Sequence, residues 1–277
     1  MSLTIGFVTD LHFGPAAYHD GKLRKLTHHA ADLTRDVVRV MNERLKPDLL
    51  VNLGDDIEDE SREADLARYT ECHDILRTAT AELVNVAGNH DMIHLTREDL
   101  SRIWHRDPDH PSAPTSRPLF YSIDRGGFHI AILHTIERKD EDVRIPHAQL
   151  EWLEHDLAQT TLPVIVLMHH SASEQDLEDS FWFKGLSHLA LVKERAELRS
   201  ILEKSGKVRV VFNGHVHRNH LDVIAGIPYV TIQSLIENLD EDAPGRPAAA
   251  HALATFTESR IVVRVHGNDP ARYQFDR

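Results

Sequence analysis

The stretch VRVVFNGHVH, residues 208–217, reads as a buried strand that runs directly into two imidazole side chains. Four of its first five residues are large and apolar, and Gly214 then precedes His215 and His217. A short run of this kind is typical of a strand buried in a central sheet. Ligands of α/β proteins bind beyond the carboxyl ends of the strands, so the two histidines are candidate ligands of a bound group.

The same combination of apolar run and polar end recurs at four other places. Apolar runs at about 3–9, 48–53, 82–86 and 164–168 each precede donor side chains. These donors are Asp10, His12, Asp55, Asn89, His90 and His169. Carboxylate, amide and imidazole groups suit Zn, Mn, Fe, Co or Ni, and the lack of thiolates argues against a structural zinc site. Five such strand ends predict one site for more than one metal ion.

Spacing within the motifs predicts how the donors point. Asp10 and His12 are two residues apart, as are His215 and His217. Side chains two apart in an extended segment share a face, so each pair is expected to present both donors on one side. Gly214 allows a close approach of the backbone.

Composition narrows the classes of partner. The net charge of −13 argues against a long nucleic acid, which is bound through clustered Lys and Arg. A small phosphorylated substrate remains compatible with this charge, since bound cations reverse the local field. The lone Cys72 excludes an intramolecular disulfide and is expected to be a small apolar helix residue.

The chain shows neither a signal peptide nor a run near the roughly 20 apolar residues that span a bilayer. We therefore expect a cytoplasmic protein with no membrane partner. Because donors occur from Asp10 to His217 and no linker or repeat separates them, residues 1–277 are expected to form a single domain. The sequence does not indicate the oligomeric state.

Alternating strand and helix patterns in the first half, followed by hairpins, predict an α/β fold with two packed mixed sheets flanked by helices. Besides the strands above, helices are expected at about 22–45, 62–79, 96–104, 147–159 and 191–204. Loops are expected at 105–118 and 171–188, and further strands at 120–124, 128–133, 220–224, 227–233, 251–257 and 260–266.

The motifs resemble, in type and order, those of the calcineurin-like metallophosphoesterase superfamily. The family pattern D-x-H, G-D, G-N-H-[DE], H and G-H-x-H corresponds here to Asp10-x-His12, Gly54-Asp55, Gly88-Asn89-His90-Asp91, His169 and Gly214-His215-x-His217. The resemblance covers about residues 3–220 and is closest in style to bacterial class III cyclic-nucleotide and glycerophosphodiester phosphodiesterases. It implies a four-layer α/β/β/α sandwich with the metal site at the carboxyl ends of the strands.

The resemblance also implies roles for single residues. One divalent ion would be held by Asp10, His12, Asp55 and His217, and a second by Asp55, Asn89, His169 and His215. The ions, Mn, Fe, Zn or Co, would turn bound water into the hydroxide that attacks phosphorus and would offset phosphoryl charge.

Catalytic roles follow from the same resemblance. His90 would stabilise the phosphoryl group or protonate the leaving oxygen. Asn89, His90 and His170 would contact the substrate. Glu58 occupies a position where relatives commonly carry Asp, and it would orient His90.

Several neighbours of the motifs allow a plainer interpretation. His170 is expected to line the pocket rather than to bind metal. Asp56, Asp59 and Glu60 are expected to form a solvated acidic loop, and His134 to be packed near the site. The segment 181–184, Phe-Trp-Phe-Lys, fits either simple packing of a long loop or a cap on the substrate side.

The predicted activity is hydrolysis of a small phosphate ester, with a phosphodiester favoured. Phosphoprotein phosphatases carry an Arg-Gly pair where this chain has Asp59-Glu60. A phosphomonoesterase or a nucleotide pyrophosphatase would use the same donors and remains an alternative. A nuclease would need a basic surface, and the complete set of donors disfavours a metal-free scaffold.

Overall fold

Two mixed β-sheets form the centre of the molecule. The computed structural model describes residues 2–105, 118–138, 141–240 and 242–276. Within these residues the first sheet contains β1 (Leu3–Val8), β4 (Leu49–Asn52), β5 (Glu82–Asn85), β12 (His251–Phe256), β13 (Arg260–His266) and β14 (Ala271–Asp276). The second contains β6 (Tyr121–Arg125), β7 (Phe128–Ile132), β8 (Val164–Leu167), β9 (Val208–Asn213), β10 (His220–Ile224) and β11 (Ile227–Thr231).

Both sheets combine parallel and antiparallel neighbours. The strand orders are β14-β13-β12-β1-β4-β5 and β10-β11-β9-β8-β7-β6. In the first sheet β1, β4 and β5 are parallel, and in the second β7, β8 and β9 are parallel. The predicted donors follow the carboxyl ends of β1, β4, β5, β8 and β9. The expected α/β class with two mixed sheets is confirmed.

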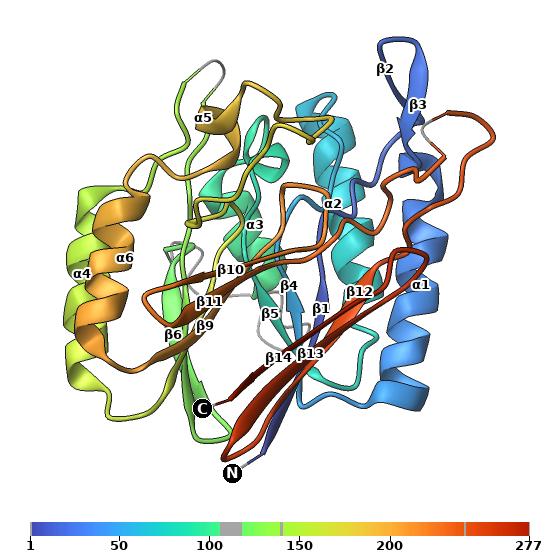
Figure 1. The fold of residues 1–277 in the computed structure, drawn as a ribbon. Helices are drawn as coiled ribbons and strands as arrows, with labels where there is room; N and C mark the ends of the chain where they lie inside the picture. Colours follow the sequence, from blue (N-terminus) through green and yellow to red (C-terminus); the bar gives the residue numbers. More distant parts are fainter. Residues whose placement is uncertain (1, 106–117, 139–140, 241, 277) are drawn as a thin grey trace.

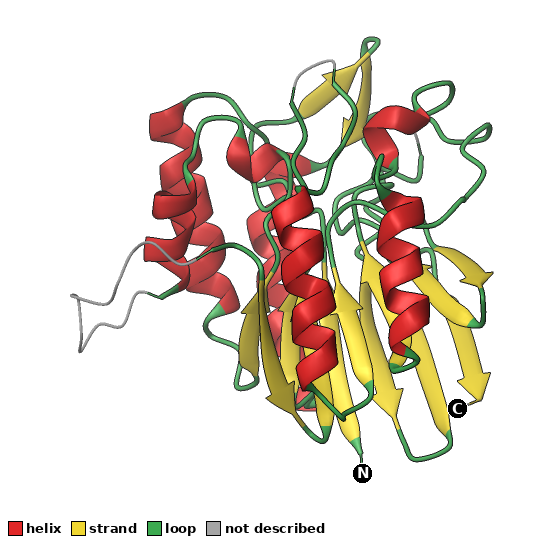
Figure 2. Cartoon of the chain, turned by 90° about the vertical axis from the view of Figure 1, so that its left-hand side faces the viewer, coloured by secondary structure: helices red, strands yellow, loops and turns green. Residues whose placement is uncertain are grey.

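Helices cover the outer face of each sheet, which gives four layers (Figure 1). Against the first sheet lie α1 (Ala30–Val40), its continuation η2 (Met41–Leu45), α2 (Arg62–Leu76) and α3 (Arg97–Trp104). Against the second lie α4 (His147–Gln159) and α6 (Arg195–Ser205). The short helices η1 (Thr27–His29), η3 (His90–Met92) and α5 (Ser187–Ala190) lie in the connections. Figure 2 shows the helices packed along the strands.

The core between the sheets explains why the central strands are apolar on both faces. Phe7 of β1 and Phe212 of β9 meet there with ring centroids 4.4 Å apart, and Phe128 meets Phe256 at 5.2 Å. All four side chains are buried. One face of each strand packs in this layer and the other packs under helices, so a continuous apolar run results.

The predicted starts of two helices are wrong. The expected helix at 22–45 begins only at Ala30, because residues 17–25 form a hairpin of β2 (Ala17–His19) and β3 (Lys22–Lys25). Asp20 and Gly21 at its tip have φ of 50° and 77°, as a tight hairpin turn requires. The expected helix at 191–204 begins at Arg195.

Strand β14 was not predicted. Its residues are alternately half-buried and exposed, and charged and polar residues interrupt its apolar pattern. Most of the proline-rich loop expected at 105–118 lies outside the described residues.

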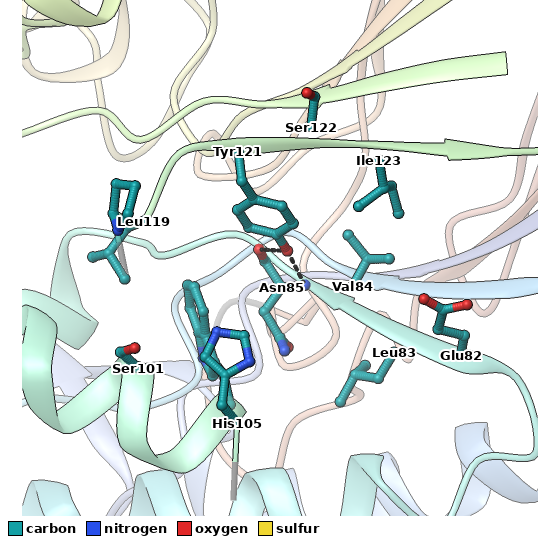
Figure 3. A pocket seen from close by; sticks show the side chains of 12 residues that line it. Glu82, Leu83, Val84, Asn85, Ser101, His105, Leu119, Tyr121, Ser122 and Ile123 are labelled. Atoms are coloured by element: carbon teal, nitrogen blue, oxygen red, sulfur yellow. Dashed lines mark hydrogen bonds between the residues drawn. The ribbon is translucent and has the colours of Figure 1, made fainter. Parts of the chain in front are cut away.

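A tyrosine joins the edges of the two sheets. Tyr121 of β6 donates its hydroxyl hydrogen to the carbonyl of Asn85 (3.0 Å), and its oxygen accepts from the Asn85 amide (3.3 Å) (Figure 3). The cavity beside it, about 450 Å³, is lined by residues of β5, α3 and β6 and by none of the predicted donors. The cavity therefore lies where the edges of the two sheets meet, and it is separate from the predicted donors.

Replacing this tyrosine tests whether it holds the edges of the two sheets together. Tyr121→Phe leaves both backbone groups of Asn85 without that partner, so we expect the free energy of unfolding to fall by about 1–2 kcal/mol in urea titrations. Tyr273→Phe is the matched control, since no hydrogen bond of that hydroxyl is found among the described residues. Equal stability of the two variants would contradict the role of Tyr121.

Candidate metal centre

The loops after the parallel strands are fastened to one another by backbone hydrogen bonds. The amide of Asp10 donates to the carbonyl of Gly54 (2.9 Å), and that of His12 donates to the carbonyl of Asp55 (3.0 Å). From the second sheet, the amide of His215 donates to the carboxylate of Asp10 at 3.0 and 3.1 Å. Motifs 205 residues apart in sequence thus form one centre.

Five of the seven predicted metal ligands have left-handed backbone. The φ angles are 51° at Asp10, 46° at His12, 58° at Asp55, 67° at His215 and 54° at His217. Such values are uncommon for residues other than glycine and cluster at functional sites. The expectation of an extended backbone at the pairs Asp10/His12 and His215/His217 is wrong, although both members of each pair do join the cluster.

One group of donor atoms surrounds a point next to β1 and β9. His12 Nε2 lies 3.2 Å from His217 Nε2, and His217 Nε2 lies 3.5 Å from Asp10 Oδ1. His12 Nε2 also lies 3.8 Å from Asp55 Oδ2. Donors at about 2.1 Å from one cation are separated by roughly 3.0–3.5 Å, so these spacings fit a common ion.

A second group surrounds a point next to β5 and β8. His169 Nε2 lies 3.1 Å from Asn89 Oδ1, 3.2 Å from His215 Nδ1 and 3.2 Å from Asp55 Oδ2. Asp55 Oδ2 therefore approaches both groups, as a bridging ligand would. The structure brings together all seven residues predicted as metal ligands, and this donor set fits two divalent cations.

Carboxylates and imidazoles of the buried centre shift one another's pKa values. Burial alone raises the pKa of the Asp10 and Asp55 carboxyls, but the adjacent histidines hold both pKa values below the ordinary range. Burial lowers the pKa of His169, yet Asp55 and Asp10 raise it to about 10. Likewise Asp10 and Glu237 raise the pKa of His217 to about 9. Since a metal-bound imidazole is neutral, cations would displace these protons.

The catalytic candidate His90 sits beside this cluster with its ring held by a carboxylate. His90 Nδ1 lies 2.5 Å from Asp59 Oδ1, and its backbone amide donates to Asp55 Oδ1 (2.9 Å). The ring centroid is 4.8 Å from that of His12. About a quarter of the side chain, 26%, is exposed, so a substrate can reach it. Nearby carboxylates outweigh burial and raise the pKa of His90.

The carboxylate in contact with His90 Nδ1 is that of Asp59, whereas Glu58 contacts His12, although donor atoms of His12, Glu58 and His90 lie within 4.8 Å of one another. The predicted role of Glu58 in orienting His90 therefore stays a prediction. Glu58 Oε2 lies 2.9 Å from His12 Nδ1 and accepts from Lys25 Nζ at 2.9 Å. The amide of Glu58 donates to the carbonyl of Phe13, which fixes the residue beside the first motif. Glu58 thus contacts a predicted metal ligand, and the adjacent residue Asp59 contacts His90.

The neighbouring acidic residues are less solvated than expected. Asp56 is fully buried and accepts from the side-chain amide of Asn52 at 2.7 and 2.9 Å. Burial raises its pKa well above the ordinary value. Glu60 is exposed and pairs with Arg68, as a solvated loop residue would. Only Glu60 fits the prediction made for the three residues.

Asp91 holds two of the motifs together, a role that the sequence interpretation missed. Its buried carboxylate accepts from the backbone amides of Asp55 (3.0 Å), Asp56 (2.8 Å) and Gly88 (2.9 Å). Burial raises its pKa to about 6. In the sequence, Asp91 was marked only as the last residue of the G-N-H-D motif.

His170 and His134 lie near the centre in different ways. His170 is buried, with Nδ1 2.7 Å from Thr135 Oγ1 and Nε2 3.3 Å from Glu137 Oε2. It also belongs to a possible ligand cluster with His169 and His215, so its expected lining role stays a prediction. Both backbone polar groups of His134 bond to the side chain of Gln149, as expected for a packed residue.

Glu237 is a further missed contact of the centre. Its Oε2 lies 2.7 Å from His217 Nδ1, and its carboxylate accepts from Trp182 Nε1 at 3.1 and 3.2 Å. A carboxylate on the second nitrogen of a ligating histidine fixes the ring and raises its basicity. Glu237 follows β11 in a segment without a motif, so no signal marked it.

Known proteins share both the motifs and the fold. A family model described as calcineurin-like phosphoesterase matches residues 3–219, most of the chain. The chain belongs to the calcineurin-like phosphoesterase family. It is therefore a phosphoester hydrolase by family, and the resemblance seen in the motifs is confirmed. No described helix has the length and hydropathy to cross a membrane.

Among curated relatives, a protein of Synechococcus sp. named "probable cyclic nucleotide phosphodiesterase" is 26% identical over 99% of this chain and 96% of its own length. One of the same description from Psychrobacter sp. is 24% identical over 72% of this chain and 55% of its own. Among solved structures, a dimetal phosphatase from Danio rerio has a TM-score of 0.74 at 16% identity and 98% coverage of both chains. Purple acid phosphatase from yellow lupin seeds has a TM-score of 0.67 at 15% identity, over 98% of this chain and 53% of its own. These structures share the fold of this family member.

Removing the Asp91 carboxylate tests its role in holding the motifs. Asp91→Ala leaves three buried amides without an acceptor, so we expect the free energy of unfolding of the metal-free protein to fall by about 3 kcal/mol in urea. The control Asp36→Ala removes an exposed pair with Arg39, worth about 0.5 kcal/mol. A change no larger than the control would show that Asp91 does not hold the loops.

Proposed function

We propose that this chain is a dinuclear-metal-dependent phosphodiesterase of small esters. The observation that carries the proposal is the convergence of seven donor side chains, with Asp55 between the two groups and His90 beside them and partly exposed. One cation would be held by Asp10, His12, Asp55 and His217, and the other by Asp55, Asn89, His169 and His215. Two such ions would activate water and neutralise charge on the phosphoryl group.

The protein's own residues would then position the ester and supply a proton. Asp59 holds His90 at Nδ1, which leaves Nε2 to face a phosphoryl or leaving-group oxygen. Nearby carboxylates raise the pKa of His90, and a protonated imidazole at this position would donate a hydrogen bond or a proton. The departing alkoxide would take this proton as the bond between phosphorus and its oxygen breaks. Asn89, adjacent in sequence, would contact a phosphoryl oxygen.

Support for a diester comes from the relatives named cyclic nucleotide phosphodiesterases and from the absence of an Arg-Gly pair at Asp59-Glu60. The substrate class is tested by turnover of purified protein loaded with Mn, Fe, Zn or Co. The panel contains diesters, monoesters and pyrophosphate esters. Faster turnover of monoesters or pyrophosphates than of diesters would overturn the diester assignment, and undiminished turnover after metal removal would overturn the metal mechanism.

Two adjacent residues should separate metal binding from proton donation. Asn89→Ala removes a donor of the second group, so elemental analysis is expected to find about one metal ion per chain rather than two. His90→Ala should retain both ions and lose about 10²–10⁴-fold in kcat, the range for general acid catalysis. Wild-type turnover by His90→Ala on every substrate would remove it from the mechanism.

A second pair of variants tests which acidic residue serves which histidine. Asp59→Asn should lower kcat and shift the acidic or basic limb of the pH–rate profile, because it alters the partner of His90. Glu58→Gln should weaken metal affinity by about 10-fold or more, because it alters the partner of His12. Titration of metal into metal-free protein and pH profiles of kcat provide the two readouts. Exchanged effects would support the predicted role of Glu58 at His90.

A further inference from the structure

A cluster of three aromatic rings adjoins the candidate metal centre. His19 lies 5.4 Å from Phe181 and 5.2 Å from Trp182 between ring centroids, and Phe181 lies 4.9 Å from Trp182. The Trp182 ring is 5.8 Å from that of His217. We call His19, Phe181 and Trp182 the aromatic cluster. It extends outward from a predicted metal ligand.

Two segments far apart in sequence build the cluster. His19 comes from the β2–β3 hairpin, and the other rings come from the segment before α5. Figure 1 shows the hairpin and α5 at the same end of the sheets. This is also the end at which the parallel strands carry their donors. The cluster thus lies at the end of the sheets that carries the predicted donors.

Cations and a carboxylate hold the rings in place. The guanidinium of Arg24 lies 3.5 Å from the centroid of Phe181, and Lys25 Nζ lies 5.2 Å from that of Trp182. Trp182 also donates to Glu237, and Glu237 is bridged to the backbone of Lys25. Cation–π contacts and these hydrogen bonds order the rings before any ligand arrives. Ligand binding then costs less conformational entropy.

The cluster is exposed where the metal ligands are buried. Phe181 is 41% exposed, and the side chain of His19 is 54% exposed. A single exposed aromatic residue is common on a protein surface. Two exposed rings that are held in place beside the candidate metal centre call for an explanation. Arg24 and Lys25 are buried against the rings, and Lys25 pairs with Glu58 at 2.9 Å, so the exposed part of the cluster is aromatic. Exposed rings held in this way suit a planar ligand.

We propose that the aromatic cluster binds the base of a nucleotide ester whose phosphoryl group lies at the metal centre. The proposal rests on the proposed function, because it assumes that the phosphoryl group binds at those donors. Bases stack on exposed rings without requiring a particular sequence of hydrogen-bonding groups. Phe181, with Arg24 behind one face, supplies the outer stacking surface. Trp182 and His19 fix its orientation.

Binding of two matched ligands tests this subsite apart from turnover. The ligands are the methylene phosphonate analogues of AMP and of ribose 5-phosphate, which differ only in the adenine and have no ester bond at phosphorus. Calorimetry uses the full chain loaded with Mn²⁺. We expect the adenine analogue to bind about tenfold more tightly, as one stacked base allows. Phe181→Leu should remove most of this difference without altering affinity for the ribose analogue.

Two further variants serve as controls. Phe181→Tyr keeps a ring and should keep the preference for adenine. Tyr18→Leu removes an exposed ring of the same hairpin, and this residue points away from the face of His19 because neighbouring strand residues alternate. It should leave both affinities unchanged.

Equal affinity of the wild type for the two analogues would overturn the subsite. Equal weakening of both by Phe181→Leu would also overturn it, since the ring would then only support the loop. Either result together with intact diester hydrolysis leaves the proposed function standing. A preference for adenine in a protein that hydrolyses no ester would support the subsite and refute the proposed function.

Discussion

The carboxylate of Asp55 is the group on which the architecture of the centre depends. It is buried, its Oδ2 approaches histidines from two directions, and its Oδ1 accepts from the amide of His90. A buried charge is costly unless it is paired and hydrogen-bonded. The two sheets supply those partners from opposite sides. The loops of both sheets must therefore stay in place around Asp55 to offset its charge.

The position of Asp55 is itself maintained by strained backbone and by a second carboxylate. Left-handed φ angles at Asp10, His12 and Asp55 persist only where surrounding contacts determine them. Asp91 provides such contacts through three backbone amides. At Gly88 a Cβ atom would overlap the Asp55 carboxylate, so this residue of the motif is needed for close approach. The family motif thus encodes ligands and the packing that presents them.

How much could be predicted depended on whether a residue lay at the end of a buried strand. The central strands and the seven donors were predictable, because apolar runs with polar ends leave a strong local signal. The contacts of Asp59 and Glu58 were not, because these adjacent side chains meet different histidines that lie in other motifs. Leu23 of the hairpin fits the helical spacing of Leu26 and Leu33, so the predicted helix began too early.

Contacts between distant segments were even harder to predict from the sequence. Glu237 and Lys25 meet the centre from a connection and a hairpin that have no pattern of their own. Strand β14 alternates half-buried and exposed residues at a sheet edge, where charged side chains weaken the apolar signal. Such contacts follow from the tertiary fold, and a single sequence does not display them.

The bond between His215 and Asp10 has a consequence for synthesis of the protein. Its partners are 205 residues apart. At about 5–20 residues per second, roughly 10–40 s separate their emergence from the ribosome. During that interval the first aspartate and histidine exist without the ligands that complete their cluster. The nascent chain therefore cannot assemble the full set of donors until His217 has emerged, and binding of two cations would have to follow that point.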